Sequence, residues 1–278
     1  MYKKFEMELA GRTLRVDVDR VAKQANGAVL MHYGDTTVLC TATASEKPRD
    51  GIDFFPLSVE YNERLYAVGK IPGGVIDRPM RPLFPKDYRN DVTLENLVMS
   101  VDQDCSPELT AMLGAAIATS ISDIPFDGPI STTQVGLVDG EFVFNPTAAQ
   151  KEVSDLALTV ASTKEKVIMI EAGANEVPEA QMIEAIFAAH ELNQKVIAFI
   201  ETIVAECGKA KHEYTSCAVP EELFEAIKEI VPPAEMEEAV FTDDKQTREE
   251  NIRVITEKLE EAFAENVSTL QKLGRLLR

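Results

Sequence analysis

The spacing of apolar residues changes once along this chain, near Val177, and the change limits the folds open to it. Before this point most of the chain alternates apolar and polar residues over short runs, which is typical of β-strands. Beyond it apolar residues recur every three or four positions, as in amphipathic helices. A chain of 278 residues can form one large domain or two modest ones. We therefore predict an α+β domain over residues 1–206, with an antiparallel or mixed sheet, and a small all-helical domain over residues 207–278.

Turn signals and one helix organise the strand-rich part. Gly11–Arg12, Gly34–Asp35 and Asp139–Gly140 each separate two strand-forming runs, so each predicts a hairpin. Residues 54–69 contain a further strand candidate. Residues 106–122 begin with a serine cap and a proline, and continue with small and apolar residues. This composition predicts a buried helix that lies close to a sheet.

The helical part begins with a long helix between Pro178 and Gly208. Three shorter amphipathic helices follow it, separated by proline or by Asp243–Asp244. The period of the long helix predicts a single buried face that contains Met182, Ile183, Ile186, Phe187, Ala189, Val196, Ile197, Ile200 and Val204.

The charge and the cysteines restrict the protein's class. A formal charge of −19 argues against adhesion to nucleic acid or to anionic membranes through net charge alone. The N-terminus lacks the apolar core of a signal peptide, and no run approaches the roughly 20 apolar residues that span a bilayer. Four scattered cysteines show no metal-binding spacing and predict free thiols in a reducing compartment. We expect a cytoplasmic protein without a membrane partner.

Residues 64–90 are basic within this acidic chain. They hold six basic residues (Arg64, Lys70, Arg78, Arg81, Lys86 and Arg89) and two acidic ones. Guanidinium groups bind phosphate oxygens in a forked geometry, and three prolines at a spacing of three would restrict the backbone that presents them. The segment therefore predicts a phosphate-backbone contact. Two alternatives remain: salt bridges to Asp77, Asp87 and Asp91, or a polyproline ligand for an SH3-type groove.

Other candidate sites carry weaker signals. Asp102 and Asp104 are close enough to share a divalent ion, but two carboxylates alone more often cap the next helix. His32, His190 and His212 are isolated, and we expect structural roles for them. Neither a Gly-rich dinucleotide motif nor a P-loop is present.

Five motifs, taken together and in this order, carry a family resemblance: GDTTVLCTATAS, YAVGKIPGG, IDRPMRPLFP, ISDIPFDGP and EAGANEVPE. The chain resembles the N-terminal part of the bacterial polynucleotide phosphorylase family. The resemblance implies an RNase PH-like (ribosomal protein S5 domain 2-like) core followed by an all-helical domain. Family members degrade single-stranded RNA from its 3′ end, and inorganic phosphate attacks the terminal linkage to release nucleoside diphosphates. They use Mg²⁺, form a trimeric ring, and contain a second RNase PH-like core domain, which carries the chemistry.

Departures from the family pattern indicate the non-catalytic copy of the core. Where the catalytic copy has a Gly-Ser-Ser-Ser phosphate site, this chain has Cys105, Ser106, Pro107 and Glu108. Of the two aspartates that hold the metal, only Asp155 is matched, and Ala149 stands at the other position. The resemblance therefore implies no catalytic or metal-binding residue here.

The same resemblance implies RNA contact and ring assembly for this chain. Its RNA-binding candidates are Arg78, Arg81 and Arg89, with Arg64 and Lys70 beside them. Family members carry a longer loop between the positions of Gly74 and Val75, so no residue here is assigned to it. Other implied partners are members of RNA-degradation complexes. The alternative is a ring scaffold without direct RNA contact.

Overall fold

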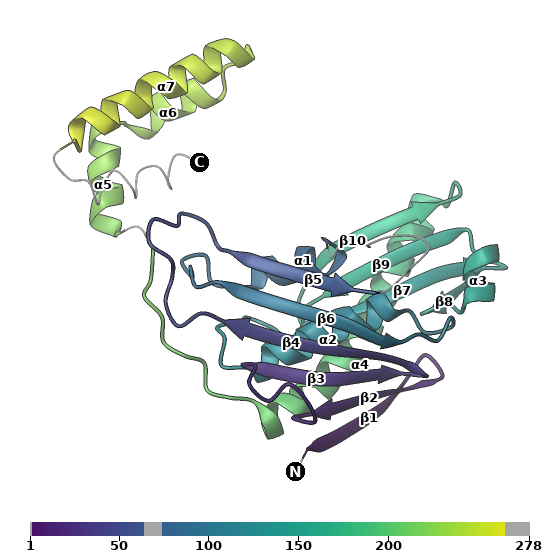
Figure 1. Ribbon diagram of the computed structural model, residues 1–278. Coiled ribbons are helices and arrows are strands. Elements are labelled where there is room, and N and C mark those ends of the chain that lie inside the picture. Colours follow the sequence, from purple (N-terminus) through teal and green to yellow (C-terminus); the bar gives the residue numbers. More distant parts are fainter. Residues whose placement is uncertain (1, 64–73, 219, 265–278) are drawn as a thin grey trace. The chain divides into compact units, whose positions relative to one another are not determined.

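The computed structural model describes residues 2–63, 74–218 and 220–264 (Figure 1). The chain divides into two compact units. Unit 1 comprises Met1–Arg49 and Phe55–Thr215, and unit 2 comprises Asp50–Phe54 and Ser216–Arg278. The α+β class is confirmed for unit 1, while a domain boundary at residue 206 stays a prediction.

Six strands form the first sheet of unit 1 (Figure 1): β1 (Lys3–Leu9), β2 (Arg12–Val18), β3 (Gly27–Tyr33), β4 (Thr36–Ala44), β5 (Leu57–Asn62) and β6 (Val92–Ser100). Their order is β1-β2-β3-β4-β6-β5, and only the β5–β6 pair is parallel. The hairpin at Gly34–Asp35 is confirmed. The first hairpin turns one residue earlier than predicted, because Ala10 and Gly11 take the positive φ angles of a tight turn (48° and 75°) and Arg12 already pairs with Leu9.

The second sheet has the order β10-β9-β7-β8. Its strands are β7 (Ser131–Val138), β8 (Glu141–Phe144), β9 (Leu156–Ser162) and β10 (Val167–Ala174). The predicted turn at Asp139–Gly140 joins β7 to β8 and is confirmed. A short helix, α3 (Ala148–Val153), follows β8. Sequence analysis missed it, although Thr147 and Gln150 form a capping box at its start.

Helix α2 (Pro107–Ile121) is the buried helix that the sequence predicted. It packs on β3, β4, β6 and β7, and every residue from Leu109 onward is buried. Glycine permits the close approach: a Cβ at Gly27 would lie 1.9 Å from the carbonyl oxygen of Ala118. This packing fixes the helix N-terminus, and hence Glu108, relative to both sheets.

Helix α4 (Glu179–Cys207) packs on β7, β9 and α2, but its buried face differs from the prediction. Ile183 and Phe187 are 53% and 63% exposed, whereas Ala185, Ala189 and Asn193 are fully buried. Alanines let the helix approach the sheet, and the Asn193 side chain bonds to Thr133, Val160 and Ser162. A polar residue at a buried position misled the period analysis.

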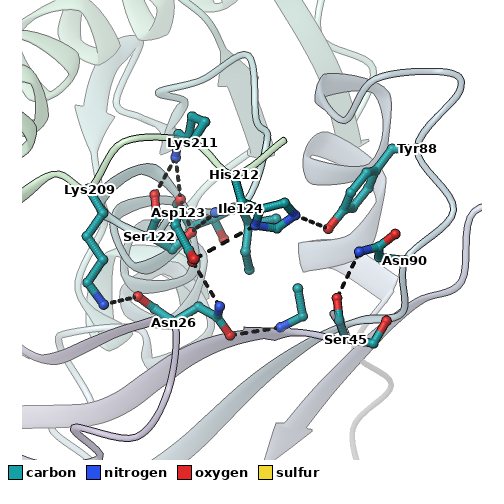
Figure 2. Close-up of polar contacts among 12 residues, drawn as sticks. Asn26, Ser45, Tyr88, Asn90, Ser122, Asp123, Ile124, Lys209, Lys211 and His212 are labelled. Carbon is teal, nitrogen blue, oxygen red and sulfur yellow. Dashed lines mark hydrogen bonds and ion pairs between the residues drawn. The ribbon is translucent and has the colours of Figure 1, made fainter. Parts of the chain in front are cut away.

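Residues 208–215, which we call the strap, return along unit 1 after α4 (Figure 2). The Lys211 ammonium donates to the carbonyl oxygens of Thr119, Ser120 and Ser122 at the end of α2, at 2.7–3.2 Å. His212 lies with Nε2 3.0 Å from the Tyr88 hydroxyl. This contact fits the structural role predicted for His212.

Unit 2 contains the helices α5 (Glu221–Ile230), α6 (Pro233–Val240) and α7 (Lys245–Ala262). Their small core consists of Val231, Ala239, Ile255 and Leu259. The predicted all-helical character is confirmed over the residues described after the strap. Within the described ranges, no helix has the length and apolar character needed to cross a membrane.

Candidate nucleic-acid interface

The proline-rich segment is helical. Helix α1 (Gly74–Met80) leads into a 3₁₀ turn, η1 (Arg81–Leu83), with Pro79 inside the helix and Pro82 inside the turn. The side chains of Ile76, Met80, Phe84 and Tyr88 are buried and anchor the segment to the core of unit 1. A polyproline II ligand is extended, so this backbone excludes that alternative for residues 74–83. The anchored segment carries three of the five RNA-binding candidates.

The Arg81 side chain connects two neighbouring elements of unit 1. Its guanidinium group binds both carboxylate oxygens of Asp77, at 3.0 and 2.8 Å, and donates to the carbonyl oxygens of Phe55 and Leu57. One side chain thereby joins α1 to the start of β5. This is the salt bridge to Asp77 that the alternative interpretation anticipated.

Arg89 also contacts its own neighbourhood. Its NH1 group donates to the carbonyl oxygens of Lys86 and Tyr88, at 2.7 and 2.9 Å. Its Nε is buried and makes no hydrogen bond within the described part of the chain. Neither Asp87 nor Asp91 is its partner: Asp87 accepts from Tyr214, and Asp91 pairs with Arg49.

Arg78 differs from both. Its side chain is 65% exposed, and its one ion pair among the described residues is a 3.3 Å contact with Glu171 on β10. An exposed pair of this kind contributes little stability, about 0–1 kcal/mol. Of the three candidates in the described ranges, Arg78 thus has the guanidinium group that is most available to a ligand. Arg64 and Lys70 lie outside the described residues.

The start of α2 consists of a capping serine, a proline and a carboxylate. The Ser106 hydroxyl accepts from the Leu109 amide and caps the helix, and Pro107 offers no N–H group. Burial raises the pKa of the Glu108 carboxyl, and the charges of Glu63 and Glu171 raise it further. A carboxylate at this position would disfavour phosphate, and the absence of a phosphate site here stays a prediction.

The paired aspartates bind backbone groups. The amides of Asp104 and Asp35 donate to Asp102, which lowers the pKa of that carboxyl. Asp104 accepts from the Ala148 amide at the start of α3. Asp155 is contacted by the Asn175 side chain at 3.4 Å. In the described ranges no three His, Cys, Asp or Glu side chains form a group that could hold a metal.

The surroundings of the cysteines and of His32 fit structural roles for these residues. Free thiols are confirmed: no cysteine forms a disulfide, and Cys40 and Cys105 are buried. His32 lies between Arg15 and Thr37, and burial lowers the pKa of its imidazole. Sequence analysis missed Glu171 as the partner of Arg78, because no sequence signal links residues 93 positions apart.

Comparisons with known proteins agree with this architecture. Residues 10–125 match the profile described as 3′ exoribonuclease family, domain 1, and residues 128–191 match domain 2 of that family. Together the two matches cover more than half of the chain. Rice Rrp46 shares the fold at 15% identity (TM-score 0.58), covering 68% of this chain and 93% of that one. A chain of an archaeal exosome core does so at 14% identity (TM-score 0.56), covering 72% and 87%.

Curated relatives are far closer in sequence. The polyribonucleotide nucleotidyltransferase of Lachnoclostridium phytofermentans is 75% identical over 96% of this chain and 40% of its own length. Those of Ruminiclostridium cellulolyticum and Staphylococcus epidermidis are 52% and 46% identical, over 98% and 99% of this chain and 41% and 42% of their own lengths. This chain thus spans about 40% of the length of these relatives. By its profile matches and its fold, the chain belongs to the 3′ exoribonuclease (RNase PH) family.

Proposed function

We propose that this chain is the N-terminal part of a polyribonucleotide nucleotidyltransferase that degrades single-stranded RNA 3′ to 5′ by phosphorolysis. In that enzyme the chain would contact RNA and contribute to the ring, while the reaction occurs elsewhere. The high identity to such enzymes supports the reaction class. The observation that carries the division of labour is the start of α2, where a capping serine, a proline and a carboxylate stand in place of an anion site.

The cofactor requirement follows the same division. The whole enzyme would use inorganic phosphate as co-substrate and Mg²⁺ as its metal. The described residues do not fit a Mg²⁺ site, because no three His, Cys, Asp or Glu side chains among them come together, and Asp102 and Asp104 accept from backbone amides. We therefore derive no step through the metal on this chain.

The partners of the proposed enzyme are single-stranded RNA, the second RNase PH-like core domain, and two further copies in a homotrimer. Members of RNA-degradation complexes are additional partners, and the compartment is the cytoplasm. We assign the leading RNA contact to Arg78, because its guanidinium group is exposed and only weakly paired. Arg81 binds Asp77 and the carbonyl oxygens of Phe55 and Leu57, and Arg89 donates to carbonyl oxygens within its own segment. Both would therefore help chiefly by holding the segment in place. Arg64 and Lys70 remain further candidates.

The RNA contact can be tested with a matched pair of variants. Arg49 is 66% exposed and pairs with Asp91, so Arg49→Ala removes a comparable surface charge outside the segment. We expect Arg78→Ala to weaken binding of a single-stranded oligoribonucleotide and to lower the slope of log K against log salt by about 0.7, the value for one lost phosphate contact. Arg49→Ala should leave both unchanged. Filter binding over a salt series measures this, and equal binding by wild type and Arg78→Ala would favour the scaffold alternative.

A further inference from the structure

A cleft of unit 1 lies between the start of α2 and the second sheet. Two adjoining hollows, of about 260 and 300 Å³, share Gln134, Ala157 and Thr159 in their lining. Glu108 and Met112 of α2 also line it, as do Lys151 of α3 and Glu171 of β10. Together the two hollows are large enough for a small organic ligand.

The floor of the cleft is set by strand register. Gln134, Thr159 and Glu171 are direct neighbours across β7, β9 and β10, so their side chains form one polar row on the same face. The next row consists of Gly136, Ala157 and Gly173, which leave a flat apolar strip beside it. Helix α4 covers the opposite face of this sheet, where Leu158 and Val160 pack against its alanines.

Glu171 pairs with Arg78, but four other polar side chains around this floor have no protein partner in the described part of the chain. No described residue forms a hydrogen bond or an ion pair with the side chains of Glu108, Gln134, Lys151 or Thr159. Partial burial raises the pKa of the Glu108 carboxyl and lowers that of the Lys151 ammonium, although Lys151 as a whole is exposed. None of these side chains contributes to the buried polar atoms that lack a partner in the described ranges, so their polar atoms reach the solvent and can form hydrogen bonds with a ligand.

The chemistry of the lining selects the ligand. Two carboxylates offer hydrogen-bond acceptors and disfavour an anion inside the cleft. The flat strip of Ala157 and Gly173, with Met112 beside it, suits a planar ring. The polar row can exchange hydrogen bonds with hydroxyl groups, and Arg78 stands beside Glu171, where a phosphate could remain outside.

We propose that this cleft binds the nucleoside part of a ribonucleotide, with the base amino group donating to Glu108 and the ribose hydroxyls facing the row of Gln134, Thr159 and Glu171. The inference rests on the proposed function, because RNA contact is what brings a nucleotide to Arg78. It goes beyond that function by giving the chain a specific pocket for a nucleotide in addition to a charged surface.

Adenosine tests the proposal because it is a nucleoside without phosphate. Titration of the ¹⁵N-labelled 278-residue chain should shift the backbone amides of Thr159, Ala172 and Gly173 in a saturable way. Purine riboside, which lacks the exocyclic amino group, should bind about tenfold more weakly, the usual effect of losing a hydrogen bond to a charged group. Inorganic phosphate should cause no saturable shift at these amides.

Two variants complete the test. Glu108→Met should weaken adenosine binding about tenfold and abolish the difference between adenosine and purine riboside. Glu184→Met, a control on the exposed side of α4, should preserve both. The proposal is overturned if adenosine causes no saturable shift in the wild type, or if Glu108→Met binds both nucleosides as the wild type does. Arg78→Ala should not change adenosine binding, so failure here and failure of the RNA contact are separate results.

Discussion

The two ends of helix α2 differ in how the protein treats their polar groups. At the C-terminal end, the strap satisfies the free carbonyl groups: Lys211 alone binds three of them, and Asp123 accepts from Asn26 while facing His212 (Figure 2). At the N-terminal end, Glu108 faces a cleft without a partner among the described residues. The C-terminal end of α2 therefore contributes to stability, whereas the N-terminal end leaves the Glu108 carboxyl available to a ligand.

The largest loss of stability should come from a substitution that removes the Lys211 hydrogen bonds at the C-terminal end of α2. Lys211→Met keeps the length of the side chain but removes a charged donor from three carbonyl oxygens, of which that of Thr119 still accepts from Ser122. We expect the free energy of unfolding to fall by about 3 kcal/mol, because hydrogen bonds to a charged group contribute about 1.5–3 kcal/mol each and do not add fully. Chemical denaturation measures this. Lys209→Met is the control, since the Lys209 side chain binds only the carbonyl oxygen of Asn26 among the described residues and its backbone bond to Ile121 is kept. Equal losses for the two variants would contradict the account.

A smaller loss should follow when one neutral bond is removed from the same network. Tyr88→Phe deletes the hydroxyl group next to His212 Nε2 and preserves the buried ring. The expected loss is about 1 kcal/mol, the usual net contribution of such a bond. A thermal shift equal to that of Lys211→Met would show that the strap is not held mainly by the lysine.

At the N-terminal end of α2 we expect a substitution to raise the stability of the protein. The folded-state pKa of Glu108 is raised, so the folded protein binds this proton more tightly than the unfolded chain does, and ionisation of Glu108 lowers stability as pH rises through the folded pKa. Glu108→Gln should therefore stabilise the protein at pH 7 by about 0.5 kcal/mol, the scale of partly exposed substitutions. The gain should disappear near pH 4, where the wild-type carboxyl keeps its proton. Unfolding at both pH values measures it, and a destabilised variant at pH 7 would contradict the assignment.

The sequence predicted the stabilised elements well, because their signals are local. Ser106 and Pro107 mark the start of α2, and Gly34–Asp35 marks a turn, within a few residues of each structural feature. The α4 face was predicted in part: Ala189 and Ile200 are buried, but Phe187 is exposed, and Asn193, a polar residue outside the predicted face, is buried and hydrogen-bonded.

The candidate site could be predicted only in outline. The charge of the segment that holds Arg78 identified it as a candidate site. Its helical structure was not predicted, because three prolines favour an extended backbone. Two features of the site depend on how distant strands align. They are the pairing of Arg78 with Glu171 and the row of Gln134, Thr159 and Glu171. The sequence of a single segment does not specify its register with other strands. The attachment of Lys211 to α2 likewise joins residues about 90 positions apart.

The central claim is that this chain contacts RNA without carrying out phosphorolysis. The most direct measurement is release of nucleoside diphosphates by the purified 278-residue chain, given single-stranded RNA, inorganic phosphate and Mg²⁺, with RNA binding followed in the same samples. The account predicts salt-sensitive binding and no release above background. Sustained release that scales with the concentration of the chain would contradict it.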